Sequence, residues 1–466
     1  MSWLSRRMSP LTGALKGVAA VAAAAATLAL PGQASAQSII RDTEIEAIIR
    51  EWSDPVLSAM GLIPADVEIL LVNDPSLNAF ATRGRIMGIH TGLILETDTP
   101  NQLLGVIAHE GGHIKNRHTL RDGASDAARQ PFLVSMALGA LAIAAGAPDA
   151  GAALLGSSQY FGTLSALRYL QSQEGEADLT GARALEAAGE SGRGLVEFFE
   201  NFRSQEVFSD SRRYPYFRSH PLSSDRIEAL RRPVAAASNY ERRDSPERMA
   251  QHALMLAKIR AFLDLPTYTY RAYPETDQSL PARYARAIAW YRDGRTDRAL
   301  AAVDELMQGD PDNPYFWELR GQILFEEGRP AEAVDAHRRA VELKPDAPLL
   351  RINLAHALIE TNDPARLDDA INELKLATAR ETDNPLGWRL LGQAFAAQGK
   401  EGEARLASAE YYFALGRERE AVQFALRARA MLETGTPEWR RAVDIVLASG
   451  ATPEDLADLD RRTTRN

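Results

Sequence analysis

Residues 281–435 repeat small side chains at a fixed spacing, and this period limits how that part of the chain can fold. The group Gly294-Arg295 with Ala299 recurs 34 residues later as Gly328-Arg329 with Ala333. A period of this length is typical of repeats that each hold one pair of helices and cannot bury their apolar faces alone. We therefore expect stacked helix pairs that form a curved solenoid with a concave binding surface.

These repeats resemble the tetratricopeptide family. The first full unit matches its pattern at Trp317, Gly321, Ala333, Ala340 and Pro345. Further units follow, with a small insertion near Asp363 and a last hairpin that starts near Gly416. Because the repeated residues are small or apolar, we predict that they form the core, and that His337 and His356 are packing or surface residues and not metal ligands.

The stretch from His109 to His113 reads H-E-G-G-H and carries the clearest chemical signal. Apolar residues precede it, and Thr99-Pro100 is a good start for a helix, with Gln102 at the spacing of a capping box. Histidines four apart lie on one helical face, where both can bind one Zn²⁺. Glu110 is then placed to act as general base toward water.

Gly111 and Gly112 lower the helix propensity of this motif by roughly 1 kcal/mol each. Two explanations stay open: a substrate chain that approaches the helix closely, or tight packing against a neighbouring helix.

A second acidic motif lies about sixty residues downstream. Glu174 and Asp178 are four apart on an expected helix and share a face, whereas Glu176 points elsewhere. We expect Glu174 to be the third zinc ligand and Asp178 to accept a hydrogen bond from a ligand histidine. The alternative is a solvated acidic surface.

Together these motifs resemble the gluzincin peptidases, the family of HtpX and the CAAX prenyl protease. Further segments that carry the resemblance are Asn78-Ala79-Phe80-Ala81, Gly88 with Thr91-Gly92-Leu93-Ile94, and Ser219-His220-Pro221 followed by Asp225-Arg226-Ile227. The resemblance implies His109, His113 and Glu174 as zinc ligands, Glu110 as base and His220 near the metal. It leaves His220 either as an extra ligand that silences the site or as a hydrogen-bond donor to the transition state, while the plain alternative is a histidine that caps the next helix.

One departure concerns the glutamate ligand. The family often has Ser-Arg shortly before it, and Leu170-Gln171 stands here. The family's arginine, with any role it plays in orienting the carboxylate, is therefore missing from this place in the sequence.

The N-terminus reads as an export signal. Arg6, Arg7 and Lys16 precede an apolar, alanine-rich stretch from Val18 to Leu30, and Ala34-Ser35-Ala36 is a small-x-small cleavage site. We expect cleavage after Ala36 and a periplasmic protein. An uncleaved anchor is the second choice, because the apolar core is short.

Residues 37–266 are expected to form the metal-binding domain. The pattern predicts a helix from about Asp42 to Met60 and strands at 67–72 and 86–91. One strand is expected to border the active site and to take an extended substrate at its edge, with Asn78 and Ala81 nearby; a plain turn is the alternative for Asn78.

An apolar stretch at 131–146 is about sixteen residues long, short of the roughly 20 needed to span a bilayer, and a second apolar run follows up to residue 155. We expect helices packed on the zinc domain, with peripheral membrane contact or a mobile lid as alternatives. Residues 267–280 read as an extended connector, and 436–466 as a C-terminal cap or tail.

Composition excludes several functions. The net charge of −10 disfavours a nucleic-acid partner. The chain has no cysteine, so disulfides and thiolate ligands are excluded and only His, Asp and Glu remain as ligands.

We therefore expect an α+β zincin-like metalloprotease domain, mostly helical with a small sheet, followed by an all-α tetratricopeptide-repeat solenoid. The expected activity is that of a periplasmic endopeptidase with one Zn²⁺ per chain. The branch of the family with C-terminal repeats implies unfolded or misassembled outer-membrane proteins as substrates, and contact with the β-barrel assembly machine through the repeats. The alternative is a non-catalytic chaperone or adaptor whose zinc site is structural or closed.

Overall fold

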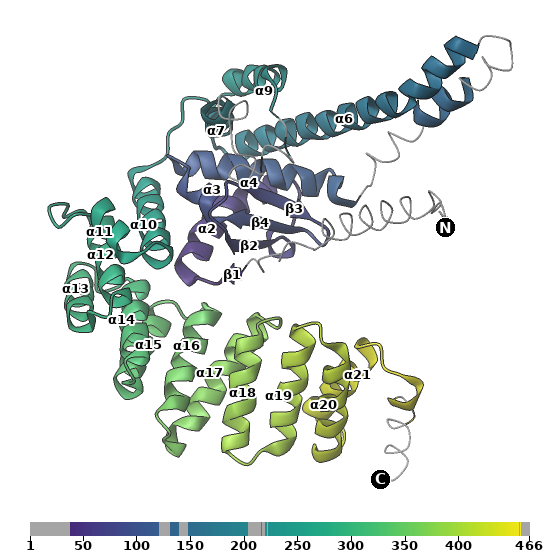
Figure 1. Cartoon of the computed structure of the whole chain (residues 1–466). Coiled ribbons are helices and arrows are strands. Elements are labelled where there is room, and N and C mark those ends of the chain that lie inside the picture. Colours follow the sequence, from purple (N-terminus) through teal and green to yellow (C-terminus); the bar gives the residue numbers. More distant parts are fainter. Residues whose placement is uncertain are drawn as a thin grey trace, which may run out of the picture.

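The structure is a computed structural model that describes residues 38–120, 131–138, 148–203, 216, 220, 222–455 and 457. A mostly helical domain with a small sheet is followed by an array of helix pairs (Figure 1), so the expected fold class is confirmed. The expected signal peptide, residues 1–36, lies outside the described residues. Within the described residues, no helix is long and apolar enough to cross a membrane.

Four short strands form the sheet. They are β1 (Ser38–Ile40), β2 (Glu68–Asn73), β3 (Ala79–Thr82) and β4 (Ile86–His90). Their order is β1-β2-β4-β3, with β2 parallel to β4 and both outer pairs antiparallel. The two strands expected from the sequence are thus present as β2 and β4, and β3 is left at an edge of this sheet.

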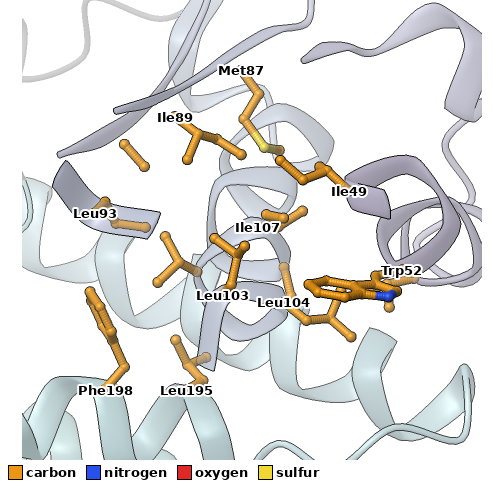
Figure 2. Close-up of a cluster of buried hydrophobic side chains, with 14 of the residues drawn as sticks. Ile49, Trp52, Met87, Ile89, Leu93, Leu103, Leu104, Ile107, Leu195 and Phe198 are labelled. Atoms are coloured by element: carbon orange, nitrogen blue, oxygen red, sulfur yellow. The ribbon is translucent and has the colours of Figure 1, made fainter. Parts of the chain in front are cut away.

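The core of the first domain forms where helices α2 (Thr43–Ala59) and α4 (Pro100–Lys115) pack with the sheet. Figure 2 shows Ile107 of α4 among side chains that include Met87 of β4 and Trp52 of α2. Each such side chain stabilises the fold by about 1.5–3 kcal/mol when fully buried. This packing fixes α4, the helix that carries the H-E-x-x-H motif.

Helix α4 begins as its sequence predicts, with one difference. The Thr99 hydroxyl accepts a hydrogen bond from the Gln102 backbone N–H at 3.2 Å. The Gln102 side-chain oxygen accepts from the backbone N–H of Asp98, at 2.9 Å, and not from that of Thr99. The capping box therefore closes one residue earlier than its usual form.

Helix α6 (Pro148–Ala187) crosses α4 at very close range. A Cβ atom added to Gly112 would lie 2.6 Å from the Ala177 carbonyl oxygen, and one added to Gly181 would lie 2.9 Å from the Ala108 carbonyl group. A Cβ atom added to Gly111 would lie 2.9 Å from the sulfur of Met60, at the end of helix α2. Of the two explanations for the glycine pair, the structure therefore supports tight packing.

Three further helices complete this domain: α3 (Thr91–Leu95), α7 (Arg193–Arg203) and α9 (Ser224–Ala236). Helix α7 packs on α4, and α9 packs on both α6 and α7. Phe198 and Phe199 of α7 are fully buried in this contact.

Helix α10 (Pro246–Leu263) belongs to the packing of both parts of the chain. Its Met255 and Ile259 join the core of the first domain, and its Ala257 and Ala261 join the core of the first repeat. The segment after it was expected to be extended, and this is wrong for Pro266–Ala272, which forms helix α11. Pro266 takes a first-turn position, where its missing N–H costs nothing.

A buried group of charges joins the two parts of the chain. The Lys258 ammonium lies 2.8 Å from Asp42 and 3.0 Å from Glu44 of the first domain. The Tyr284 hydroxyl of the first repeat donates to Glu44 at 2.9 Å. Nearby, the half-buried Glu318 has a raised pKa, because its partial removal from water outweighs the attraction of Lys258.

The repeats form five helix pairs within the described chain. Their helices are α12 (Leu280–Arg292), α13 (Thr296–Gly309), α14 (Pro314–Glu326), α15 (Pro330–Leu343), α16 (Pro348–Glu360), α17 (Leu367–Arg380), α18 (Pro385–Ala397), α19 (Glu401–Ala414), α20 (Glu418–Met431) and α21 (Pro437–Ala448). Gly294 and Gly328 have φ of 71° and 74° between paired helices, which explains why glycine recurs there. His337 is buried and His356 is half-buried, both among packing residues.

The apolar stretch at 131–155 is only partly described. Residues 131–138 are helical, and Leu133, Val134 and Leu138 are each about half exposed, at 51%, 55% and 50%. The expectation that this stretch packs on the zinc domain is therefore wrong for these residues. Residues 139–147 lie outside the described part, and whether the stretch touches a membrane stays a prediction.

Candidate metal centre

Four side chains from three parts of the chain meet beside α4. His109 and His113 come from α4, Glu174 comes from α6, and His220 precedes α9. One potential ligand atom from each lies within 4.8 Å of every other, and all four residues are buried. The structure thus brings together all the residues that the sequence singled out as ligands, together with His220.

The donor atoms lie close enough together to bind one metal ion. Nε2 of His109 lies 3.1 Å from Nε2 of His113 and 3.2 Å from Nδ1 of His220. One Glu174 oxygen lies 3.4 Å from the His109 nitrogen and 2.9 Å from the His220 nitrogen, and the other oxygen lies 3.4 Å from the His113 nitrogen. Four donors about 2.0–2.1 Å from one Zn²⁺ are about 3.3 Å apart. The donor set and its spacing therefore fit zinc.

Asp178 and Arg226 fix one side of this site. His109 donates from Nδ1 to Asp178 at 2.8 Å, which leaves the lone pair of its Nε2 facing the other donors. Arg226 of α9 donates to both oxygens of Asp178, at 2.6 and 2.9 Å, and lies 3.1 Å from Glu174. An arginine therefore orients the carboxylates after all, but it comes from α9 and not from the residues before Glu174.

Glu110 lies beside the donor cluster, and its carboxylate is the second feature of the site. Both of its carboxylate oxygens are buried and accept no hydrogen bond from the described residues. One of them lies 3.6 Å from Nε2 of His220. A buried carboxylate normally has hydrogen-bond partners, so an unsatisfied one beside a metal site is suited to accept a proton from water.

His220 is held in place by its ring neighbours. The Tyr216 ring stacks on it with centroids 4.6 Å apart, and Tyr216 is itself fully buried. The backbone N–H of His220 donates to the Tyr216 carbonyl at 2.8 Å. His220 thus has a defined orientation and does not cap α9, where Ser223 is the capping residue.

The electrostatics of the cluster favour a cation at its centre. Burial lowers the pKa of His109, but the hydrogen bonds to Asp178 and Glu174 outweigh it and raise the pKa to about 9. Burial and the neighbouring charge on His109 lower the pKa of His113 to about 2. Burial raises the pKa of Glu174, but His109 and His220 outweigh it and hold the pKa well below its usual range. One proton on the cluster thus takes the place that a dication would fill.

The predicted substrate edge lies at β3, which packs against α4 (Figure 1). The Asn78 carbonyl accepts from the His90 backbone N–H at 3.0 Å, so this residue faces β4. Because hydrogen-bonded and non-hydrogen-bonded pairs alternate in an antiparallel ladder, the backbone groups of Ala79 and Ala81 point to the open edge. Ala81 is thus placed to pair with an added strand, whereas the Asn78 backbone is already engaged.

Several contributors were missed in the sequence. Arg226 was noted only as part of a family segment, and Tyr216 was not noted at all. His118 contacts His113, and Glu176, which was expected to point elsewhere, contacts His118. A histidine five residues after the motif was the available signal for His118.

Known protein families match both parts of the chain. Residues 40–234 match the family described as peptidase family M48, and residues 282–348 and 324–394 match tetratricopeptide repeats. The site lies within the first of these matches.

Two relatives match most of the chain, and a third matches a part of it. The chain is 27% identical over 414 residues to a beta-barrel assembly-enhancing protease of Escherichia coli K12, covering 86% of this chain and 82% of the relative. It is 25% identical over 420 residues to the protein of the same name from Yersinia pestis, covering 86% and 83%. The metalloprotease YcaL of Escherichia coli K12 is 28% identical over 177 residues, covering 37% of this chain and 63% of the relative. Residues 40–234 thus form a peptidase family M48 domain, and tetratricopeptide repeats follow it.

Proposed function

We propose that the chain is a zinc endopeptidase. The observation that carries this proposal is the buried cluster of His109, His113 and Glu174, with Glu110 beside it, whose oxygens accept no hydrogen bond from the described residues. Zinc in such a site would supply a Lewis acid for the scissile carbonyl and would acidify a water. The family of the first domain, whose members are metallopeptidases, points the same way.

Glu110 is the base in this proposal. Its buried carboxylate would take the proton of the attacking water and give it to the leaving amine. Arg226 and Asp178 would hold Glu174 and His109 in place, so that the ligands need not reorganise. A substrate would add to β3 as an extended strand, with the backbone of Ala81 as one of its partners.

His220 makes the resting site latent in this proposal. Its Nδ1 occupies the fourth donor position, which a catalytic site keeps for water. His220 would have to withdraw before water can take that place. His220→Ala is therefore expected to raise basal proteolysis. A fall would support the transition-state role instead, and unchanged activity with unchanged zinc affinity would exclude both roles.

We further propose that the enzyme works in the periplasm on outer-membrane β-barrel proteins. The sequence of the first 36 residues and the names of the two relatives that match most of the chain support this. The repeats would bind unfolded or misassembled substrates, or the β-barrel assembly machine.

A second function rests on the same observation. Four protein donors close the site, as they do in structural zinc sites. The chain would then be a non-catalytic chaperone or adaptor that works through its repeats.

A strain that lacks the protein separates these functions. For an enzyme, Glu110→Gln should fail to restore the lost function although the protein folds and keeps its zinc. For an adaptor, the same variant should restore it, while a variant without the repeats should not. Complete rescue by Glu110→Gln under every stress tested would refute the protease proposal.

The ligands are tested by metal analysis of the purified full chain. His113→Ala should lose most of its zinc, because only two of the three proposed resident ligands, His109 and Glu174, remain. Full zinc occupancy in that variant would show that His113 is not a ligand.

A further inference from the structure

His113 has a partner on the side that faces away from the donor cluster. Its Nδ1 lies 3.0 Å from Nδ1 of His118, and the two rings meet edge to face with centroids 5.0 Å apart. Nε2 of His118 lies 3.2 Å from a carboxylate oxygen of Glu176. Glu176, His118 and His113 thus form a continuous series of contacts from the surface of α6 to the donor cluster.

The direction of the hydrogen bonds in this chain follows from chemistry. A carboxylate only accepts, so Nε2 of His118 carries the proton that it shares with Glu176. In a neutral imidazole the other nitrogen then accepts, and His113 must donate from its Nδ1. The reverse direction would leave an unprotonated Nε2 of His118 facing the Glu176 oxygen. This series of hydrogen bonds therefore leaves the lone pair of His113 Nε2 facing His109 and Glu174.

The backbone is bent to bring His118 into this place. Arg117, directly after α4, has a φ of 59°, a left-handed conformation that is uncommon for residues other than glycine. It reverses the chain so that the following short helical turn (His118–Leu120) returns over the end of α4. The side chain of His118 is only 6% exposed, whereas that of Glu176 is 63% exposed.

The two α4 histidines are thus supported in different ways. His109 donates to the buried Asp178, and His113 donates to His118, which Glu176 supports in turn. We propose that His118 is a positioning residue that holds His113 in the tautomer and orientation required of a zinc ligand. This inference rests on the proposed function only in taking His113 as a ligand.

The test is the zinc affinity of the full chain, measured by competition with a chromophoric chelator. Removal of such an outer hydrogen-bond partner typically weakens metal affinity about 10- to 100-fold. We expect that loss in His118→Ala. His118→Asn should recover most of it, because the asparagine carbonyl can accept from His113 near the place of Nδ1. His356→Ala removes a half-buried histidine of the repeats and is the matched control, with wild-type zinc affinity expected.

Two further measurements separate positioning from folding and from the ligand assignment. The unfolding midpoint of the metal-free protein should be similar in His118→Ala and His118→Asn, since the proposed role needs the metal. Wild-type zinc affinity in His118→Ala, or equal affinities in the Ala and Asn variants, would overturn the inference. If both His118→Ala and His113→Ala keep wild-type zinc affinity, the assignment of His113 as a ligand fails together with the inference about His118. If His113→Ala loses zinc but His118→Ala does not, only the inference about His118 fails.

Discussion

The close crossing of α4 and α6 makes Gly112 a sensitive point, although it binds nothing. The Cβ atom of Gly112→Ala would lie 2.6 Å from the Ala177 carbonyl oxygen and 3.0 Å from its Cα. Both atoms belong to the backbone of α6, so no side chain can rotate away. To bring the oxygen to the 3.4 Å of ordinary contact, the helices must shift by about 0.8 Å.

That shift acts directly on the metal site. Helix α4 carries His109 and His113, while Glu174 lies three residues before Ala177 on α6. Metal–ligand distances tolerate about 0.2 Å, so the shift exceeds what the site can absorb without rearrangement. We expect zinc affinity to fall at least tenfold, the scale seen when ligands are misoriented. Overpacking costs about 1–3 kcal/mol, and about 1 kcal/mol returns with the higher helix propensity of alanine. The free energy of unfolding should thus fall by about 1 kcal/mol.

Gly175 provides the matched control on the same helix, next to Glu174. A Cβ atom there would have no neighbour within 4 Å. Gly175→Ala should keep wild-type zinc affinity and raise the free energy of unfolding by up to about 1 kcal/mol. The measurements are denaturant unfolding of the metal-free chains and chelator competition. Wild-type zinc affinity in Gly112→Ala, or an equal loss in Gly175→Ala, would refute the reasoning.

Three more predictions concern stability. Gly321→Ala should lower the free energy of unfolding by about 1–3 kcal/mol in a denaturant titration, because its Cβ would lie 2.6 Å from the His337 ring. Gly392→Ala, at the matching position of another repeat, should be neutral or slightly stabilising, because its nearest neighbour would be 3.4 Å away. Lys258→Met should cost about 3 kcal/mol by leaving buried carboxylates unpaired, and a loss under 1 kcal/mol would show that this contact does not stabilise the domain junction. Burial lowers the pKa of His252 to about 4, so the unfolded chain, with the ordinary pKa of 6.5, binds the proton first as the pH falls. The free energy of unfolding should therefore decline by up to about 3 kcal/mol between pH 6.5 and 4, and His252→Gln should remove this pH dependence.

The sequence predicted those features that depend on local spacing. Histidines four apart had to share a face of α4, and Glu174 and Asp178 had to share a face of α6. The repeat period likewise predicted helix pairs, because Gly294 and Gly328, 34 residues apart, each follow the first helix of a pair.

The features it missed depend on contacts between distant segments. Nothing before Glu174 indicates that Arg226, 52 positions later, supplies the guanidinium that orients it. The role of Gly112 became clear only when the Ala177 backbone was placed against it.

Local conformation accounts for two other differences. The positive φ of Arg117, which turns His118 back toward the site, has no sequence signal because arginine seldom adopts it. The prolines and tyrosines near residue 270 suggested an extended connector, but Pro266 starts a helix there.

The most direct test of the central claim is cleavage of an unfolded β-barrel protein by purified full chain, with zinc per chain measured on the same samples. Wild type, His220→Ala and the double variant His220→Ala with Glu110→Gln should each hold about one zinc per chain, because the site keeps three ligands. The account predicts faster cleavage by His220→Ala than by wild type, and none by the double variant. Cleavage by the double variant at the rate of His220→Ala, with zinc retained, would contradict the assignment of Glu110 as the base and with it the proposed mechanism.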